Sequence, residues 1–308
     1  MSQLREQVAD YLRLRRSLGY KLVEHERFLN QFLDYLEKSR ATTITAENAL
    51  AWAKLPDGAN PRWHGARLSA VRGFAAWARA FDADIQVPPT GLLPMRTVRA
   101  TPYLYSQDQV RALMNAAAGL VPETKSATLT TLIGLLAVTG MRAGEAVRAD
   151  LADLDLDAGT LTVRGTKFGK SRLLPLHNSA LEALRAYLRI RSTAAAPGTS
   201  ALLVSVAGTR LTYDNAHRVF KKLTAQAGIR PRSTACRPRM HDLRHSFAID
   251  TLLDAYRSGA DVGPWLPLLS TYLGHTEPAD TYWYLHAAPE LLALAADRVN
   301  TLDAQDQR

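Results

Sequence analysis

The sequence predicts a mainly helical fold with a small β-sheet, an α+β class, divided between two domains. Three observations predict it. The 308 residues, 47% of them hydrophobic, are enough to bury two cores. Apolar residues recur at helical spacing along most of the chain. A pair of short β-prone runs in the second half predicts a hairpin among these helices.

Residues 1–87 are expected to form a small helical domain, because four segments each carry one apolar stripe. The stripes comprise Leu4, Val8, Tyr11 and Leu12, then Phe28, Leu29, Phe32, Leu33 and Leu36, then Leu50 and Trp52 in a helix starting near Thr45, then Leu68, Val71, Phe74, Ala78 and Phe81. The polar faces carry several basic residues: Arg13, Arg15, Arg16, Lys21, Arg62, Arg67 and Arg72. These residues either meet phosphates or form a solvated surface, and the sequence of this domain alone favours the surface.

Residues 88–102 are predicted to be a stiff linker. Four prolines (Pro88, Pro89, Pro94 and Pro102) and Gly91 interrupt the periodicity there. A second domain is expected over residues 103–308. It opens with Ser106 and Gln109, which have the spacing of a capping box in front of an apolar helical stripe.

The second domain is predicted to hold a β-hairpin with a basic tip. Residues 160–164 and 172–176 are the β-prone runs, and the turn between them, residues 165–170, carries two lysines. Residues 201–205 are a candidate third strand. From Tyr213 onward the pattern is helical nearly to the end, and residues 289–308 predict a C-terminal helix with an apolar stripe.

The charge and cysteine content bound the function. A net charge of +9 and a pI near 9.8 favour a polyanionic partner, and nucleic acid is the leading candidate. The single Cys236 excludes an internal disulfide and a multi-cysteine zinc site, and fits a reducing compartment. Charged residues interrupt the first twelve positions, and the longest apolar run, residues 129–141, is too short to span a bilayer. A cytoplasmic protein without membrane contact is expected.

The first of three constellations with chemical potential is the segment 139–145, where an apolar helix ends at Gly140 and Arg142 follows. Glu145, three residues on, can orient the Arg142 guanidinium so that its paired N–H groups grip an oxyanion. The alternative is an ordinary Arg/Glu pair on a helix surface, which these seven residues alone favour.

The second constellation is His241 and Arg244, which lie one helical turn apart and so project from one face. Together they can donate hydrogen bonds to one phosphoryl group, although a capping histidine beside a solvated arginine fits equally well. The third is the segment 273–284, in which a helix ends at Gly274, His275 follows, and Tyr284 comes nine residues later. A lone tyrosine is nearly always structural.

Taken in order, these constellations and the hairpin lysine resemble the catalytic signature of the tyrosine recombinases, the phage integrase family with its Xer-like members. The resemblance implies that Arg142 and Arg244 clamp a phosphate, that Lys167 is the hairpin lysine, that His241 and His275 complete the site, and that Tyr284 is the nucleophile. Lys170 competes with Lys167, while Tyr282 and Tyr272 lack the nine-residue offset from His275. Trp283, directly before Tyr284, departs from the family pattern.

The resemblance also implies the architecture and the partners. The N-terminal domain resembles the family's SAM-like core-binding domain, and the second domain its catalytic domain. We expect double-stranded DNA as the substrate, a 3′-phosphotyrosine intermediate, and a homotetramer on DNA formed from free monomers, with the C-terminal segment exchanged between protomers. Arg230, Arg232, Arg237 and Arg239 form a basic loop that either contacts DNA or is only solvated.

No cofactor or metal is expected, because the sequence contains neither a phosphate-binding G-x-x-x-x-G-K-[ST] loop nor a cluster of carboxylates. Two other functions compete with recombination. A type IB topoisomerase would use much the same residues without exchanging strands between sites. A non-catalytic DNA-binding regulator would have lost part of the catalytic set, whereas all six positions are present in this sequence.

Overall fold

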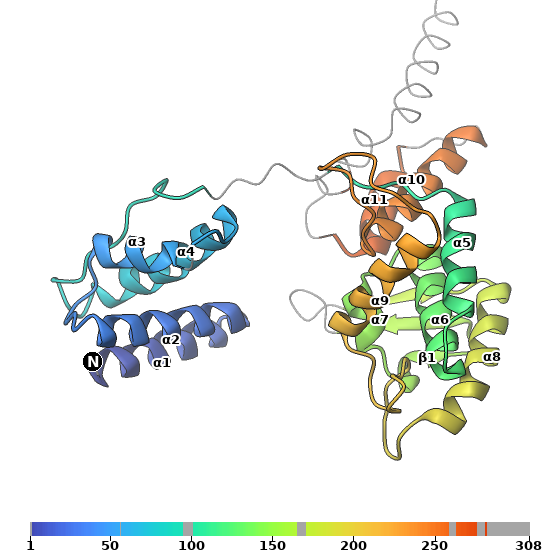
Figure 1. Cartoon of the computed structure of the whole chain (residues 1–308), viewed down its shortest axis with the longest axis horizontal. Coiled ribbons are helices and arrows are strands. Elements are labelled where there is room, and N and C mark those ends of the chain that lie inside the picture. The colour runs from blue at the N-terminus through green and yellow to red at the C-terminus, as the bar shows by residue number, and fades with distance from the viewer. Residues whose placement is uncertain are drawn as a thin grey trace, which may run out of the picture. The chain divides into compact units, whose positions relative to one another are not determined.

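The computed structural model describes residues 2–55, 57–94, 101–164, 171–258, 263–275 and 281. The chain divides into two compact units, Met1–Arg99 and Ala100–Arg308, and the division falls within the proline-rich segment (Figure 1). The described part is mostly helical with one small sheet, so the predicted fold class is confirmed. The hairpin tip, Tyr282, Tyr284 and residues 289–308 lie outside the described residues.

The N-terminal unit consists of the four predicted helices. They are α1 (Ser2–Ser17), α2 (Val23–Lys38), α3 (Ala46–Lys54) and α4 (Pro61–Ala78). Local sequence fixes where two of them begin. Thr45 and Asn48 form a capping box at α3, and Asn60 caps α4 with Pro61 in its first turn.

The apolar stripes of these four helices meet in one core. Two details of the prediction were wrong. Phe81 follows the end of α4 and is exposed, because the helix stops three residues before it. Arg67 was expected on a polar face, but it is buried between aromatic rings, which a long side chain with a planar head can accomplish.

In the second unit, helices surround a small sheet. Its elements are α5 (Gln107–Ala118), α6 (Glu123–Thr139), α7 (Ala143–Arg148), the 3₁₀ turn η1 (Leu151–Asp153), β1 (Leu154–Asp155), β2 (Thr160–Val163), β3 (Arg172–Pro175), α8 (Asn178–Ala194), α9 (Tyr213–Gln226), α10 (Asp242–Arg257) and α11 (Trp265–Leu273). The predicted capping box of Ser106 and Gln109 opens α5.

The sheet is antiparallel in the order β1-β2-β3, and β2 and β3 are the predicted hairpin. The candidate third strand at residues 201–205 was wrong, because β1 occupies that place in the sheet. Ala201 and Val204 instead form isolated bridges to Asp150 and Arg210. Residues 201–204 are all fully buried, so their apolar character reflects packing in the core rather than strand pairing.

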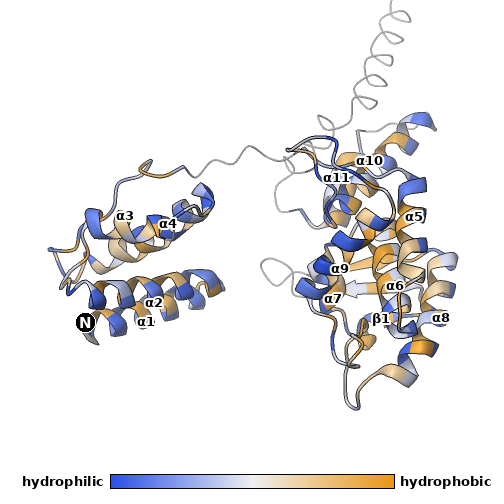
Figure 2. Ribbon diagram, in the orientation of Figure 1, coloured by the Kyte–Doolittle hydropathy of each residue, from blue (hydrophilic) through white to orange (hydrophobic). Residues whose placement is uncertain are grey.

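Helix α6 forms the centre of this unit. It packs against α5, α8, α10 and α7, and hydrophobic residues gather around it in Figure 2. None of the helices within the described residues is long and apolar enough to cross a membrane. The C-terminal end of α6 is the part that matters for the site, because α7, α10 and α11 meet there.

Candidate active site

The end of α6 positions Arg142. The helix closes at Gly140, which has a positive φ of 59°, and a Cβ there would lie only 2.3 Å from Cδ1 of Phe247. The chain then turns into α7, with Arg142 as its N-cap residue. A glycine is therefore required at position 140, between the end of α6 and Arg142.

The predicted pair of Arg142 and Glu145 is present, and it is not a surface pair. The Glu145 carboxylate accepts a hydrogen bond from the Arg142 backbone N–H at 2.9 Å and another from its Nη1 at 2.9 Å. The Glu145 side chain is 3% exposed, while that of Arg142 is 38% exposed. The carboxylate is thus a buried anchor, and part of the guanidinium remains open to a ligand.

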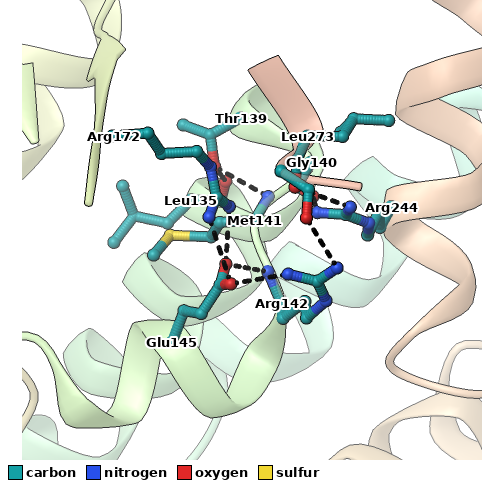
Figure 3. A network of polar contacts seen from close by, with 10 residues as sticks. Leu135, Thr139, Gly140, Met141, Arg142, Glu145, Arg172, Arg244 and Leu273 are labelled. Carbon is teal, nitrogen blue, oxygen red and sulfur yellow. Dashed lines mark hydrogen bonds and ion pairs between the residues drawn. The ribbon is translucent and has the colours of Figure 1, made fainter. Parts of the chain in front are cut away.

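Arg172, at the start of β3, is a site residue that sequence reasoning missed. Its Nη2 donates to Oε2 of Glu145 at 2.7 Å and its Nη1 donates to Oε1 at 3.2 Å (Figure 3). The available signal was strand alternation, since Arg172 shares a face of β3 with the buried Leu174. A charge on the inner face of a strand requires a partner, and the nearby buried carboxylate is Glu145.

The two arginines on Glu145 determine its charge state. Burial raises the pKa of this carboxyl, but hydrogen bonds from Arg172 and Arg142 outweigh burial and lower the pKa to about 2. Glu145 is therefore ionised at any pH at which the protein works.

Arg244, on α10, is 2% exposed and joins the ends of two helices. Its Nη1 donates to the carbonyl of Gly140 at 2.9 Å, and its Nη2 donates to the carbonyl of Leu273 at 2.8 Å. These carbonyls belong to the C-terminal ends of α6 and α11, where the helix dipole favours a cation. Figure 3 shows Arg142 and Arg244 side by side at these helix ends.

His275 lies directly beside this pair. Arg142 Nη2 donates to the carbonyl of Gly274 at 3.3 Å, and Gly274 ends α11 with a φ of 70°. The next residue is His275, whose backbone N–H donates to Ser270 and whose Nδ1 lies 2.7 Å from the hydroxyl of Thr281. The structure thus brings the predicted Arg142, Arg244 and His275 to one place.

His241 is the N-cap residue of α10, and its ring meets that of His245 edge to face at 4.8 Å. Burial, followed by the nearby Arg244, Arg142 and Arg239, lowers the pKa of His241 to about 4. His241 is nevertheless exposed to solvent, and water weakens these effects, so the downward direction of the pKa shift is what matters. The ring is neutral at pH 7 and can accept a proton.

Tyr272, one of the rival nucleophiles, is a packing residue. Its ring stacks on Phe247 with centroids 5.7 Å apart, and burial raises the pKa of its phenol. Both features disfavour attack by this oxygen. Lys167, Lys170, Tyr282 and Tyr284 lie outside the described residues, so the structure places four of the six predicted catalytic residues.

The arginines of the basic loop differ in their contacts. Arg239 forms an ion pair with the fully buried Asp242, with its Nη2 at 2.7 Å from the carboxylate. Arg232 lies over the ring of Tyr103 and donates to the carbonyl of Leu104. Arg230 and Arg237 are exposed. No group of three or more His, Cys, Asp or Glu side chains within the described ranges could hold a metal ion.

Comparison with known proteins decides the family. Residues 104–290 match the model of the phage integrase family. The chain is 45% identical over 306 residues to a putative integrase/recombinase, y4rB, of Sinorhizobium fredii, covering 97% of this chain and 98% of that protein. It is 34% identical over 233 residues to the tyrosine recombinase XerC of Azotobacter vinelandii, covering 76% and 72%. The chain belongs to the phage integrase family of tyrosine recombinases.

Solved structures agree at the level of the fold. A lambda integrase dimer bound to a core site superposes with a TM-score of 0.61 at 18% identity, covering 91% of this chain and 76% of that one. An integrase of the transposon Tn1549, in complex with a circular intermediate DNA, gives 0.64 at 18% identity, covering 96% and 99%. This tyrosine recombinase is therefore an enzyme of site-specific DNA recombination that cuts and rejoins DNA strands, as the sequence resemblance predicted.

Proposed function

We propose that this recombinase cuts and rejoins DNA through a 3′-phosphotyrosine formed by Tyr284, with neither ATP nor a metal ion. The observation that supports this most directly is the convergence of Arg142, Arg244 and His275 at the adjoining ends of α6 and α11. Three side chains from distant parts of the chain meet there, and one of them, the Arg142 guanidinium, is partly open to a ligand. Such a cluster suits a phosphoryl group that gains negative charge during displacement.

In the proposed step, the phenolic oxygen of Tyr284 attacks the scissile phosphorus while the bond to the 5′-oxygen breaks. A free phenol has a pKa near 10, so its proton must leave during attack. His241, whose lowered pKa keeps the ring neutral at pH 7, accepts this proton. Lys167 protonates the departing 5′-oxygen, with Lys170 as the alternative donor. Arg142, Arg244 and His275 stabilise the non-bridging oxygens.

Rejoining is the reverse of this step. A 5′-hydroxyl attacks the phosphotyrosine, the phosphodiester forms again, and the proton returns to the tyrosine. The number of high-energy bonds is unchanged, so no nucleotide is consumed. If the attacking hydroxyl belongs to a second DNA site, the strands are exchanged, and a Holliday-junction resolution assay distinguishes this outcome from simple topoisomerase activity.

Double-stranded DNA is the proposed substrate, with residues 1–87 and 103–308 as two domains that close on it. Structural neighbours of this chain were solved bound to DNA. Arg230, Arg232 and Arg237 are proposed phosphate contacts, and Arg239 is the weakest candidate because Asp242 already neutralises it. On DNA the free monomers are proposed to form a homotetramer in which residues 289–308 dock onto a neighbouring protomer.

The decisive experiment concerns Tyr284. The DNA site is first recovered by sequencing fragments that stay covalently attached to the protein, and a duplex of that site is then nicked beside the cleavage position. Wild-type protein should become trapped on this duplex as an adduct on a denaturing gel. Tyr284→Phe should give no adduct while retaining DNA binding, because only the attacking oxygen is lost.

Tyr282→Phe is the matched control and should form the adduct. Adduct formation by Tyr284→Phe would show that another tyrosine is the nucleophile.

A gel-shift experiment with the same duplex tests the DNA interface and the assembly. Neutralising the four loop arginines should flatten the dependence of affinity on salt, and removing residues 289–308 should reduce two-site complexes more than binding of a monomer.

A further inference from the structure

We propose that Arg172 is a positioning residue of the cleavage reaction, which holds the Arg142 guanidinium in place through their shared carboxylate, Glu145. The proposal rests on the proposed function, in which Arg142 meets the scissile phosphate. It adds a residue of the β-hairpin to the machinery around that phosphate. Arg172 itself is not proposed to touch DNA.

The hydrogen bonds of Glu145 show how the two arginines are coupled. Oε1 accepts from Nη1 of Arg142 at 2.9 Å and from Nη1 of Arg172 at 3.2 Å. Oε2 accepts from the backbone N–H of Arg142 at 2.9 Å and from Nη2 of Arg172 at 2.7 Å. Each oxygen therefore serves both residues. Arg172 fixes the plane of the carboxylate with a two-pronged grip, and that plane sets the direction of the Arg142 guanidinium.

Arg172 also reaches the turn that carries His275. A Cβ added to Gly274 would lie 3.0 Å from Nη1 of Arg172, so the guanidinium packs directly against this glycine. The carbonyl of the same glycine accepts a hydrogen bond from Arg142 Nη2. The Arg172 side chain thus connects β3, α7 and the end of α11, and it is only 12% exposed.

The charges give a second reason for the role. Arg142 and Arg172 carry two positive charges and Glu145 carries one negative charge, so the group has a net charge of +1. Without Arg172 the same group would be neutral, because a buried carboxylate would be paired with Arg142 alone. Arg142 would then stabilise a phosphate less, because the negative charge of Glu145 would offset its own positive charge. Arg172 keeps this part of the site positive.

The test uses single-turnover cleavage of the nicked duplex by Arg172→Gln. Cleavage should fall on the order of 10²-fold, as expected for a displaced contact in the transition state, with little change in DNA affinity. Arg142→Ala should lose at least as much. Arg164→Gln is the matched control, because Arg164 also pairs with a buried carboxylate, but with that of Asp153 rather than that of Glu145. It should cleave like the wild type.

A second substrate separates positioning from general damage to the structure. In a methylphosphonate at the scissile position, a methyl group replaces one non-bridging oxygen, so less negative charge develops and the need for Arg142 falls. The defects of Arg172→Gln and Arg142→Ala should both shrink about tenfold or more on this substrate. A structural defect would be the same on both substrates.

The proposal is overturned if Arg172→Gln cleaves the phosphodiester like the wild type, or if its defect is equal on the two substrates. If circular dichroism shows that Arg172→Gln does not fold, Arg172→Lys is compared on the same two substrates instead. Lysine keeps the positive charge but cannot donate to both carboxylate oxygens in parallel. Failure of the wild type to cleave would instead contradict the proposed function, so the two failures are distinguishable.

Discussion

The two units of this chain bury charge to very different extents. In the described part of the N-terminal unit, Arg67 is the single buried charged side chain. In the described part of the second unit, several charged side chains are buried: Glu145, Asp153, Arg191, Asp242 and Arg244. Burying a charge costs free energy unless partners compensate it. The second unit buries charge at several points, two of which, Glu145 and Arg244, lie at the candidate site.

The two most buried arginines of the described residues, Arg67 and Arg244, show what the difference means. Arg67 lies between the rings of Trp52 and Trp63, 3.8 and 4.3 Å from their centroids, and donates to the Trp52 carbonyl at 2.9 Å. Burial lowers its pKa to about 10. Its partners are close in sequence, whereas Arg244 joins carbonyls 104 and 29 residues away. The first arginine completes a local core, and the second holds the site together.

The largest expected effect comes from making the same substitution in both units. Arg244→Met should lower the free energy of unfolding by about 2–4 kcal/mol, because it deprives two buried carbonyls of a donor. It should also abolish DNA cleavage. Arg67→Met should lower the free energy of unfolding by only about 1 kcal/mol, since the loss of two cation–π contacts and one hydrogen bond is offset by relief of the desolvation of a charge. Cleavage should survive.

Hydrogen exchange followed by mass spectrometry measures these effects, because it reports peptides of the two units separately. Exchange should rise in α6 and α11 for Arg244→Met, and in α3 and α4 for Arg67→Met. Equal losses in the two variants would mean that the units tolerate buried charge alike, and the comparison between them would fail.

At the glycine that ends α6 the expected loss of stability is comparable, but DNA cleavage should be reduced rather than abolished. Gly140→Ala should lower the free energy of unfolding by about 2–4 kcal/mol. The alanine would have to adopt a left-handed backbone conformation, and its Cβ would also clash with Phe247. Gly228 provides the control. It has a similar φ of 69°, and no atom lies within 4 Å of a Cβ added there. Gly228→Ala should therefore lower the free energy of unfolding only by the strain of the left-handed backbone, about 1–2 kcal/mol.

Urea unfolding of the two glycine variants measures the difference. Cleavage should fall only in Gly140→Ala, because Phe247 lies one turn after Arg244 on α10. If both variants lost the same stability, the close approach of α10 to the end of α6 would be excluded as a constraint on the site.

These contrasts explain what could be predicted from the sequence. The helices of the N-terminal unit, the capping boxes at Thr45 and Ser106 and the hairpin follow from local patterns, and the structure has them. The pairing of Arg142 with Glu145 was also predictable, because both lie within one turn. The second arginine on Glu145 was not, since Arg172 reaches it across 27 residues. Tertiary contacts of this kind leave only a weak trace in one sequence.

The smallest expected effect concerns acid. In the second unit, burial followed by Arg244, Arg142 and Arg239 lowers the pKa of His241 from 6.5 to about 4. In the N-terminal unit, burial followed by Arg15 lowers the pKa of His25. Between the two pKa values the unfolded chain binds more protons than the folded one. The stability that each neutral histidine contributes is therefore complete above pH 6.5 and is lost as the pH falls toward the folded value.

Glu145 does not interfere in this window. Its pKa falls from 4.5 to about 2, so its contribution is lost only below pH 4.5. Urea midpoints at about pH 7 and about pH 5 should therefore differ less in His241→Gln than in the wild type, and the change should be modest because solvent reaches the ring. His25→Gln should shift the pH dependence in the same direction. An unchanged pH dependence in His241→Gln would mean that the cations of the site do not act on this ring, and would remove the support for His241 as the group that accepts the phenolic proton.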